Sequence, residues 1–489
     1  MKPNILFLMC DQFQAALLEG EHPCKTPNLD RLRKRGIHFK RAYTSNAVCT
    51  PARAGIMTGL LPHNHGALVV THTADDDQFC LRKEKPHFAQ RLKAGGYNTG
   101  YFGKWHVERT NRLEPFGWDV NCVNAVGFSP QYLEKRKLLL GGEPPRIQHS
   151  EAVYCQAPEG YRPALFTGIR DNPVEQTNMA LATEMAIEYI SLQNTQTKPW
   201  MCMLSFSEPH DPYVCGREAR DLYDADFLSL PETLYDEGER PNLYRIGMRC
   251  WKNFSDRQLR EALACYYGCV TEADAQFGRV LDILDRLGIT DNTVVIFTAD
   301  HGDCMGAHGL FCKTIGSYEE IYNVPLIVAG PGMRVGAESF ARVGTHALCP
   351  TIIELSGCEA IEELDTISFA SALFDDAAEK DYTLGYAEYN GGRILLTQRI
   401  VYKDDIKYVF NGFDMDELYD LSKDPLEKRN LANLPEYDAL LREMSALMWA
   451  IVRDTGDRSL YNSNYPALRV ASYGPDLSKV YPKGSMRII

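Results

Sequence analysis

Residues 293–303 read TVVIFTADHGD, an apolar run that ends abruptly in charged residues. The run 293–298 is rich in β-branched side chains, which is typical of a strand buried on both faces of a parallel sheet. The same pattern recurs as NILFLMCDQ at 4–12, TGYFGKWH at 99–106 and MCMLSFSEPHD at 201–211. Strands of this kind, separated by helical patterns, predict an α/β fold with a parallel sheet flanked by helices.

One long helix and five strands are predicted from local sequence patterns. In the stretch Asp256–Leu287, apolar residues step by three and four positions, which is the period of an amphipathic helix. Ser255 or Asp256 can cap this helix, and Gly288 can end it. We predict strands at residues 4–9, 99–103, 201–207, 293–298 and 324–329.

The residue pattern changes toward the C-terminus, from alternating strands and helices to a β-rich segment. We predict a catalytic α/β domain over residues 1–375 and a smaller α+β subdomain over residues 376–489. The segment 397–410 is rich in β-forming residues and predicts an antiparallel sheet, with a helix to follow at about 437–452. The tail at 459–489 has no periodicity. It is either an arm that wraps the body or a neighbouring subunit, as in a homo-oligomer, or a loose end.

Composition excludes several classes of partner. A net charge of −13 over 489 residues argues against binding to nucleic acid or to an anionic membrane surface. The opening apolar run stops at Asp11, so it indicates a strand and not a signal peptide, and no run approaches the ~20 apolar residues of a membrane span. The fifteen cysteines include no CxxC pair, which favours free thiols in a reducing compartment. We therefore expect a cytoplasmic protein.

The polar residues that follow the predicted strands indicate a single site. Ligands collect outside the carboxyl ends of the strands in open parallel sheets. Asp11, Asp300 and His301 follow two such strands, and their oxygen and imidazole donors suit Ca²⁺, Mg²⁺ or Mn²⁺ better than Zn²⁺. The alternative is that residues 300–302 form an ordinary Asx turn.

Residues 45–59 (SNAVCTPARAGIMTG) predict a short helix with a reactive end. Pro51 fits its first turn and Gly59 its end. Cys49 then lies at the helix N-terminus, where free N–H groups favour anions, and Arg53 can pair with oxyanions one turn later. The alternative is a buried structural cysteine. A phosphatase-type cysteine loop is not matched, because it needs more residues between Cys49 and Arg53.

The segment CTPAR at Cys49–Arg53, followed by Thr58-Gly59, resembles the sulfatase signature C-x-P-x-R…TG. The resemblance continues along most of the chain. It implies the alkaline-phosphatase superfamily fold, with a large mixed, mostly parallel sheet sandwiched by helices. Further segments similar to the family's motifs are PNILFLMCDQ (3–12, the metal strand), TPNLDRLRKRGIHFKRAY (26–43, the helix that follows), GKWH (103–106), FTADHGDCMGAHGLFCK (297–313) and ELYDLSKDPLEKRNL (417–431).

The resemblance implies one divalent metal, with Ca²⁺ as the first choice and Mn²⁺ or Mg²⁺ as alternatives. A neutral amide is a weaker ligand than a carboxylate, so Gln12 is expected at the edge of the coordination sphere. The implied ligands are Asp11, Gln12, Cys49, Asp300 and His301.

The resemblance also implies that Cys49 is oxidised to formylglycine by a formylglycine-generating enzyme, and that its hydrate attacks the sulfur of a sulfate ester with help from Arg53. Lys104 and Lys313 would meet the sulfuryl oxygens. His210 would protonate the leaving alcohol, and His106 would take the proton that restores the aldehyde. The residues implied to bind substrate are Lys104, His210, Asp211 and Lys313.

Without the resemblance, a solvated surface position is the default for the two lysines, and a structural role is favoured for His106 and His210. His63, His65, His72 and His308 are left outside the catalytic set, although His308 is an option for lining the pocket.

The implied function is hydrolysis of a sulfate monoester of a carbohydrate or another small alcohol. The main alternative is a phosphonate monoester or phosphodiester hydrolase of the same superfamily, although the pair Lys104 and His106 is typical of sulfatases. A non-catalytic binding protein and a sugar-phosphate mutase are weaker alternatives. The sequence motifs do not specify the substrate alcohol. We expect the loops at 69–81, 111–170 and 213–252 to select it.

Overall fold

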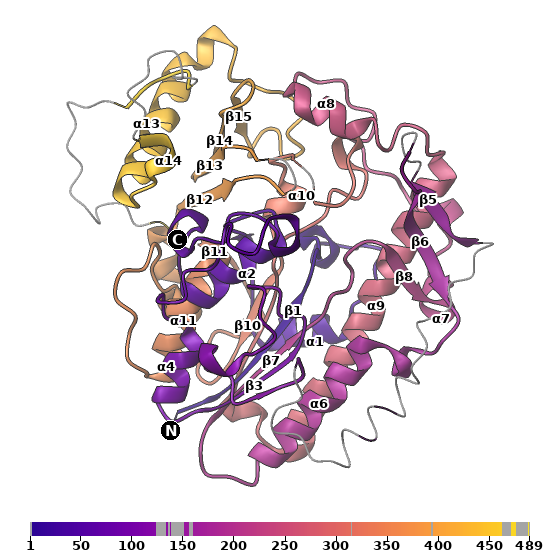
Figure 1. Ribbon diagram of the computed structural model, residues 1–489, viewed down its shortest axis with the longest axis vertical. Helices are drawn as coiled ribbons and strands as arrows, with labels where there is room; N and C mark the ends of the chain where they lie inside the picture. Colours follow the sequence, from indigo (N-terminus) through magenta and orange to yellow (C-terminus); the bar gives the residue numbers. More distant parts are fainter. Residues whose placement is uncertain are drawn as a thin grey trace.

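The computed structural model describes residues 2–123, 134, 137, 151–155, 160–313, 315–392, 395–461, 471–475 and 488. Its largest element is an eight-stranded sheet in the order β11-β2-β10-β9-β1-β7-β3-β4 (Figure 1). Strand β10 is antiparallel to both of its neighbours, and every other pair is parallel. The strands are β1 (Asn4–Cys10), β2 (Ile37–Tyr43), β3 (Asn98–Gly103), β4 (Val120–Asn121), β7 (Trp200–Ser205), β9 (Thr293–Ala299), β10 (Leu326–Ala329) and β11 (Ala337–Gly344).

The mixed, mostly parallel sheet confirms the predicted fold class, and all five predicted strands are present with small shifts at their ends. One prediction is wrong. Residues 26–43 do not form one helix, because α1 (Pro27–Arg35) ends at Gly36 and the chain continues as β2. A Cβ on Gly36 would lie 2.3 Å from the carbonyl oxygen of Val328. Only glycine allows this close approach to β10, so the helix must stop and the chain must enter the sheet.

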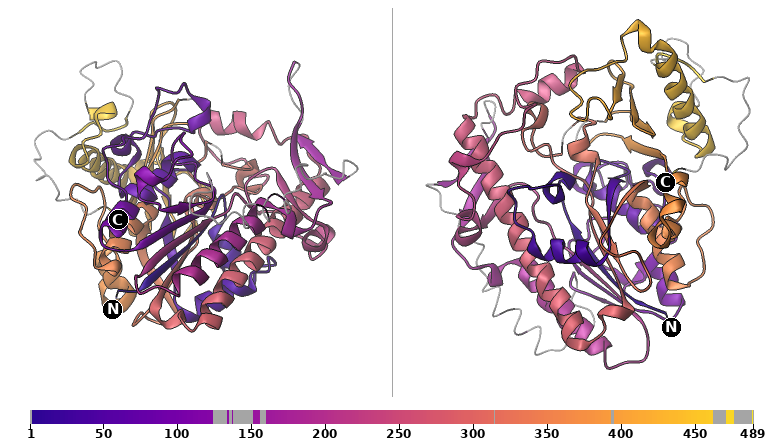
Figure 2. Two further views of the ribbon diagram at one scale, coloured as in Figure 1. Left: turned by 60° about the horizontal axis from the view of Figure 1, so that its bottom comes forward. Right: turned by 180° about the vertical axis from the view of Figure 1, so that it is seen from behind.

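Helices cover both faces of the sheet (Figures 1 and 2). The long helices α6 (Asn178–Gln193) and α9 (Asp256–Leu287) pack together over one face with α1. On the other face lie α2 (Cys49–Thr58), α4 (Phe88–Ala94) and α11 (Leu348–Ser356). Helix α9 has the predicted ends: Ser255 and Gln258 form a capping box, and Gly288 ends the helix with φ = 67°.

A three-stranded sheet that the sequence did not predict flanks α9. Its strands are β5 (Val153–Cys155), β6 (Ala164–Arg170) and β8 (Tyr213–Gly216), in the order β5-β6-β8. The shorter helices are α3 (Pro62–His65), α7 (Arg217–Arg220), α8 (Asn242–Met248), α10 (Glu319–Tyr322), α12 (Ala370–Phe374) and α14 (Arg458–Tyr461). In the described residues, none of the helices has both the length and the apolar character needed to cross a bilayer.

The C-terminal part is the predicted small α+β unit. Four antiparallel strands pair in sequence order, and helix α13 (Asp438–Asp454) packs on them. The strands are β12 (Leu384–Tyr389), β13 (Gln398–Lys403), β14 (Ile406–Asn411) and β15 (Glu417–Asp420). The boundary at 375/376 stays a prediction. Most of the tail lies outside the described residues, although Tyr473 O accepts a hydrogen bond of 2.6 Å from Trp449 Nε1 of α13.

A buried ion pair holds this subdomain together and gives a test of its stability. Arg399 of β13 donates from Nε and Nη2 to Asp457 Oδ2 at 2.9 and 2.7 Å, with both side chains almost fully buried. We expect Arg399→Leu to lower the free energy of unfolding by about 3–5 kcal/mol, because Asp457 is left as an unpaired buried charge. Thermal and urea unfolding would measure this loss.

The matched control is Lys403→Leu on the same strand, which removes the exposed ion pair with Glu443. Exposed pairs contribute at most about 1 kcal/mol. Equal destabilisation by the two substitutions would contradict the structural importance of the buried pair.

Candidate active site

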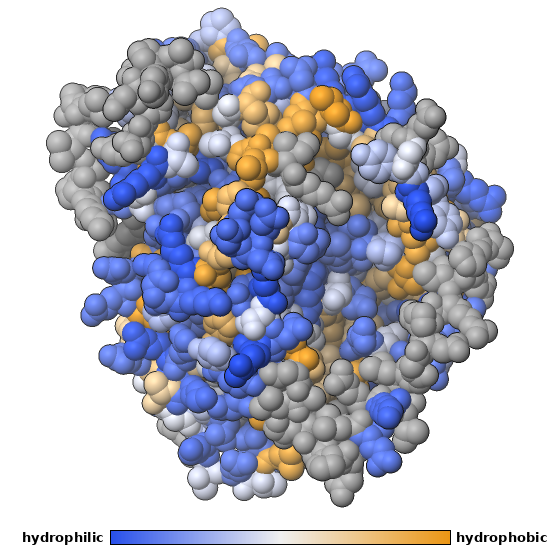
Figure 3. All heavy atoms as spheres, in the orientation of Figure 1, coloured by the Kyte–Doolittle hydropathy of each residue, from blue (hydrophilic) through white to orange (hydrophobic). Residues whose placement is uncertain are grey.

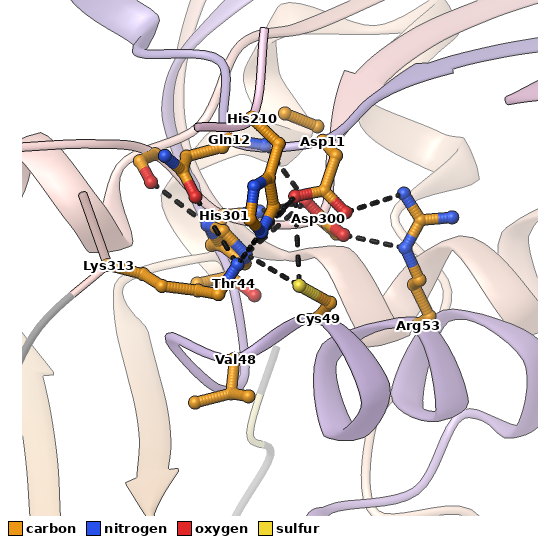
Figure 4. A network of polar contacts seen from close by, with 12 residues as sticks. Asp11, Gln12, Thr44, Val48, Cys49, Arg53, His210, Asp300, His301 and Lys313 are labelled. Carbon is orange, nitrogen blue, oxygen red and sulfur yellow. Dashed lines mark hydrogen bonds and ion pairs between the residues drawn. The ribbon is translucent and has the colours of Figure 1, made fainter. Parts of the chain in front are cut away.

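Four buried donor groups converge where β1 and β9 end and α2 begins (Figure 4). Cys49 Sγ lies 3.7 Å from Asp11 Oδ1 and 3.3 Å from His301 Nε2. One ligating atom from each of Asp11, Cys49, Asp300 and His301 lies within 4.8 Å of the others. The structure thus brings together four of the five predicted metal ligands around one point.

Cys49 owes its place to the local sequence of α2. Val48 precedes the helix in an extended conformation, Cys49 is its first residue, and Gly59 ends it with φ = 71°. The whole helix is buried. The free N–H groups and the positive end of the helix dipole therefore face the site, as predicted, and favour negative charge on the side chain of residue 49.

Arg53 holds the two carboxylates in position. Its Nε donates to Asp300 Oδ2 at 2.6 Å, and its Nη2 donates to Asp11 Oδ2 at 3.1 Å. Its Nη1 donates to Lys104 O and to Ser205 Oγ, both at 2.9 Å. Because the guanidinium is completely buried and these partners occupy it, Arg53 acts on the carboxylates and not directly on an outside anion.

The ring of His301 is oriented for metal binding. Its Nδ1 donates to Gly302 O at 2.9 Å, so in the neutral ring the lone pair is on Nε2, which faces the other donors. Two carboxylates, one imidazole and one sulfur position form a buried set of oxygen, nitrogen and sulfur donors around one point. This donor chemistry fits a single divalent cation.

Gln12 lies beside this cluster in a strained conformation, with φ = 69°. Its Nε2 donates to Asp303 Oδ2 at 2.6 Å and to Asp211 Oδ1 at 3.1 Å, while Oε1 accepts from Lys313 at 3.3 Å. The amide therefore joins the metal cluster to the residues expected to bind substrate. This position agrees with the expected place of Gln12 at the edge of the coordination sphere, and its role as a ligand stays a prediction.

The predicted lysines and one predicted histidine line the open side of the cluster. Lys104 Nζ forms an ion pair with Asp11 and lies 3.9 Å from Cys49 Sγ. Lys313 Nζ contacts His210 Nε2. His210 Nδ1 donates to Asp211 O at 2.6 Å, which directs Nε2 into the site, 4.0 Å from Asp11 Oδ1.

Charge governs protonation in this site. Burial would raise the pKa of Asp11, but the surrounding cations, led by Lys104, hold it well below its usual range. Burial and Asp11 likewise oppose ionisation of Cys49, yet Lys313 and the other cations bring the pKa of the thiol well below its usual value. Burial would lower the pKa of His210, but the charge of Asp11 raises it to about 9. An anionic group at position 49 is therefore stabilised.

Two histidines lie outside this inner cluster. His106, in a left-handed conformation (φ = 50°), stacks on His72 with ring centroids 5.6 Å apart. It lines a cavity shared with Lys104, and none of its contacts among the described residues is to Cys49, so its catalytic role stays a prediction. His308 is buried and stacks on Tyr318 at 3.6 Å, away from the catalytic cluster.

The sequence patterns assigned no role to Asp303, which organises residues 300–313, here called the catalytic loop. This buried carboxylate accepts from Tyr213 Oη and Gln12 Nε2 at 2.6 Å and from the backbone of Met305 and Cys312 at 2.8 Å. Asp303 lies in the run DHGD, but its side-chain partners Tyr213 and Gln12 come from distant segments of the chain, so residue spacing alone does not reveal its role.

The profile of the sulfatase family matches residues 3–358, and that of the N-sulphoglucosamine sulphohydrolase C-terminal region matches residues 306–454. The chain belongs to the sulfatase family. A choline-sulfatase of Rhizobium meliloti is 28% identical and covers 96% of this chain and 95% of its own. An N-acetylglucosamine-6-O-sulfatase of Bacteroides thetaiotaomicron is 26% identical, covering 91% and 86%. This sulfatase is therefore a sulfuric ester hydrolase.

Solved structures show the same fold. A structure solved in complex with its substrate D-glucosamine-2-N,6-O-disulfate has a TM-score of 0.74 at 21% identity, covering 94% of this chain and 99% of that one. A phosphonate monoester hydrolase from Silicibacter pomeroyi has a TM-score of 0.75 at 21% identity, covering 95% and 96%. The fold is thus common to both activities and does not distinguish them.

The donor cluster predicts that the sulfatase is stabilised by a divalent cation. We expect a chelator to lower the unfolding temperature and added Ca²⁺ to restore it, with Mn²⁺ and Mg²⁺ measured in parallel. A cation at a hundredfold excess over its dissociation constant adds about 2.7 kcal/mol. In Asp300→Asn the cation-dependent shift should largely vanish. An unchanged unfolding temperature of the wild-type protein in all of these additions would exclude a cation at this cluster.

Proposed function

We propose that this sulfatase hydrolyses a sulfate monoester of a carbohydrate or another small alcohol, with an aldehyde derived from Cys49 and one divalent metal. The observation that carries the proposal is the position of Cys49, at a buried helix N-terminus and within 3.3–3.9 Å of His301, Asp11 and Lys104. A structural cysteine needs no cations around it, whereas a nucleophile that receives a sulfuryl group does.

Two groups complete the chemistry when they are present. The hydrated aldehyde, formylglycine, would supply a nucleophilic hydroxyl, and a cation held by Asp11, Asp300, His301 and position 49 would lower the cost of ionising it. Ca²⁺ is the first choice, because oxygen donors dominate the set. A formylglycine-generating enzyme is then a required partner, since a thiol does not provide this nucleophile.

The chain's own residues then act on the substrate. Lys104 and Lys313 point their ammonium groups at the space in front of Cys49, where they would stabilise charge on the sulfuryl oxygens. His210 would protonate the leaving alcohol, because its Nε2 faces the site and its raised pKa keeps it protonated at neutral pH. Lys313 Nζ lies against the same Nε2 and can donate a hydrogen bond to it once the proton has moved to the alcohol.

The substrate is proposed from the relatives. Those similar over most of the chain include sulfatases named for ulvan, N-acetylglucosamine-6-O- and hexuronate-2-O-sulfate groups, alongside a choline-sulfatase and an arylsulfatase. A sulfated carbohydrate is the commonest of these classes. None of the fifteen cysteines forms a disulfide, which supports a reducing compartment such as the cytoplasm.

The alternative function is hydrolysis of a phosphonate monoester or phosphodiester. It is supported by the fold shared with the Silicibacter hydrolase and by a 27% identical multifunctional alkaline phosphatase superfamily protein of Trinickia caryophylli. The presence of both Lys104 and His106 beside one cavity favours the sulfatase reaction.

The test of the proposal compares an aryl sulfate with an aryl phosphonate, using wild-type enzyme and Cys49→Ala. We expect a higher kcat/KM for the sulfate and complete loss of turnover in the variant. Intact-protein mass spectrometry should show that residue 49 has lost sulfur and two hydrogens and gained oxygen. Preference for the phosphonate would support the alternative. Full turnover by Cys49→Ala, or by a protein with an unmodified thiol, would remove the basis of both.

The role of His210 predicts a dependence on the leaving group. For a sugar sulfate, whose alcohol is a poor leaving group, His210→Ala should lower kcat by about 10²–10⁴-fold, because general acid catalysis contributes about this much. For an aryl sulfate with an acidic phenol the loss should be much smaller. Steady-state kinetics with both substrates would measure the difference. An equal loss for both would assign His210 to positioning instead.

A further inference from the structure

We propose that a cavity beside the catalytic loop binds a second sulfated sugar unit of the substrate, so that the natural substrate is a sulfated oligosaccharide. This inference rests on the proposed function and names its substrate class. The cavity, of about 660 Å³, lies between α8, the first turn of α9 and the segment 234–240. Its volume is that of a typical small-ligand site.

Aromatic rings form the inner wall of the cavity. Trp251 and Phe254 line it and stack on each other at 6.0 Å, and Trp251 packs against Phe311 at 5.2 Å. Figure 3 shows hydrophobic side chains gathered over α8, above a hydrophilic hollow at the centre of the same face. An aromatic ring presents an apolar face, and polar side chains around it can form hydrogen bonds. Such a wall can therefore bind the face of a sugar ring.

Three cationic side chains line the cavity beside this wall, and no carboxylate among the described residues pairs with them. Arg245, Arg249 and Lys252 are exposed and form no ion pair or side-chain hydrogen bond with any residue that the structure describes. On the opposite wall, Asp236 is already neutralised by Arg240 at 2.7 Å, which leaves Glu237 as the one unpaired carboxylate there. The cavity is therefore positive in a protein whose net charge is −13. Its ligand must bring negative charge.

The cavity borders the segment that carries catalytic groups. Phe311 lines the cavity, and Lys313, two residues later, reaches His210 and Gln12. The Cα atoms of Phe311 and Lys313 are at most about 7 Å apart, because only one residue separates them. Helix α8 also packs on this segment, because a Cβ on Gly247 would lie 3.3 Å from Leu310 and 3.6 Å from Ile315. The cavity and the catalytic groups are thus bordered by one short segment, and this is the basis for placing two units of one substrate at them.

Sulfate groups on a sugar ring match this arrangement of charges and rings. Arginine binds the oxygens of such anions through paired hydrogen bonds, and the aromatic wall accepts the ring itself. An acidic peptide would satisfy the cations but would make no specific use of the rings. A small aryl sulfate would fill the catalytic pocket alone. The combination therefore favours a sulfated saccharide over both.

Binding tests this proposal without relying on turnover. Cys49→Ala protein is titrated calorimetrically with sulfated tetrasaccharides from heparin, chondroitin sulfate and ulvan, and with their desulfated forms. We expect at least one sulfated form to bind and its desulfated form to bind far more weakly. Adding Arg245→Ala, Arg249→Ala and Lys252→Ala should weaken binding at least about tenfold, since each charge-assisted contact is worth that much.

The matched control removes three exposed cations elsewhere, through Lys198→Ala, Arg286→Ala and Lys380→Ala. Because it changes the net charge equally, it separates the cavity from general attraction of polyanions. In enzyme with an intact Cys49, the cavity variant should raise KM for the bound oligosaccharide and leave the kinetics of an aryl sulfate unchanged, and the control should change neither.

The proposal is overturned if no tetrasaccharide binds, if both triple variants weaken binding equally, or if the cavity variant impairs the aryl sulfate as much as the oligosaccharide. Failure of the proposed function would look different. In that case, wild-type enzyme with confirmed oxidation of Cys49 would turn over neither the aryl sulfate nor any saccharide, whatever the binding experiment shows.

Discussion

The buried guanidinium of Arg53 is the constraint on which the rest of the active site depends. It joins Asp11 and Asp300, which come from two neighbouring strands, in a region closed to solvent. Carboxylates this deeply buried repel each other and lose hydration, so they persist only if opposite charges and hydrogen bonds compensate them. Arg53 supplies this compensation from the same helix that places Cys49. One helix therefore sets both the position of Cys49 and the geometry of the carboxylates beside it.

The strain of the backbone is concentrated in the same region. Gln12, His106 and Cys312 all adopt left-handed conformations although none is a glycine, and each follows or borders a strand end or loop of the site. Such residues cost of order 1–3 kcal/mol each and persist where the surrounding contacts determine their conformation. At Gln12 those contacts are visible: two carboxylates and a lysine fix its side chain, and Tyr266 fixes its carbonyl oxygen at 2.7 Å. The strain and the polar network are thus parts of one preorganised arrangement.

Much of the fold and several site residues could be predicted from the sequence, because their signals are local. Strands buried on both faces are continuous apolar runs, and the residues at their carboxyl ends meet at one edge, so Asp11, Asp300 and His301 were found together. The long helix was found because its period and both caps are local. Strand β2 was assigned to a helix, because the reason for the break at Gly36 is its contact with β10, far along the chain. The partners of Arg53 and the role of Asp303 were likewise hidden, because they depend on tertiary contacts.

The loop between β9 and α10 carries Asp300, His301 and Asp303 at its start and Lys313 near its end. Asp303 ties the two ends together through the backbone of Cys312. A substitution that moved this loop would displace Asp300, His301 and the lysine beside His210 at the same time. New substrate preferences are therefore more readily acquired in neighbouring segments such as α8, which touch the loop from outside and can change without disturbing the reaction. The family can keep one chemical step constant while its members diverge in the alcohols they release.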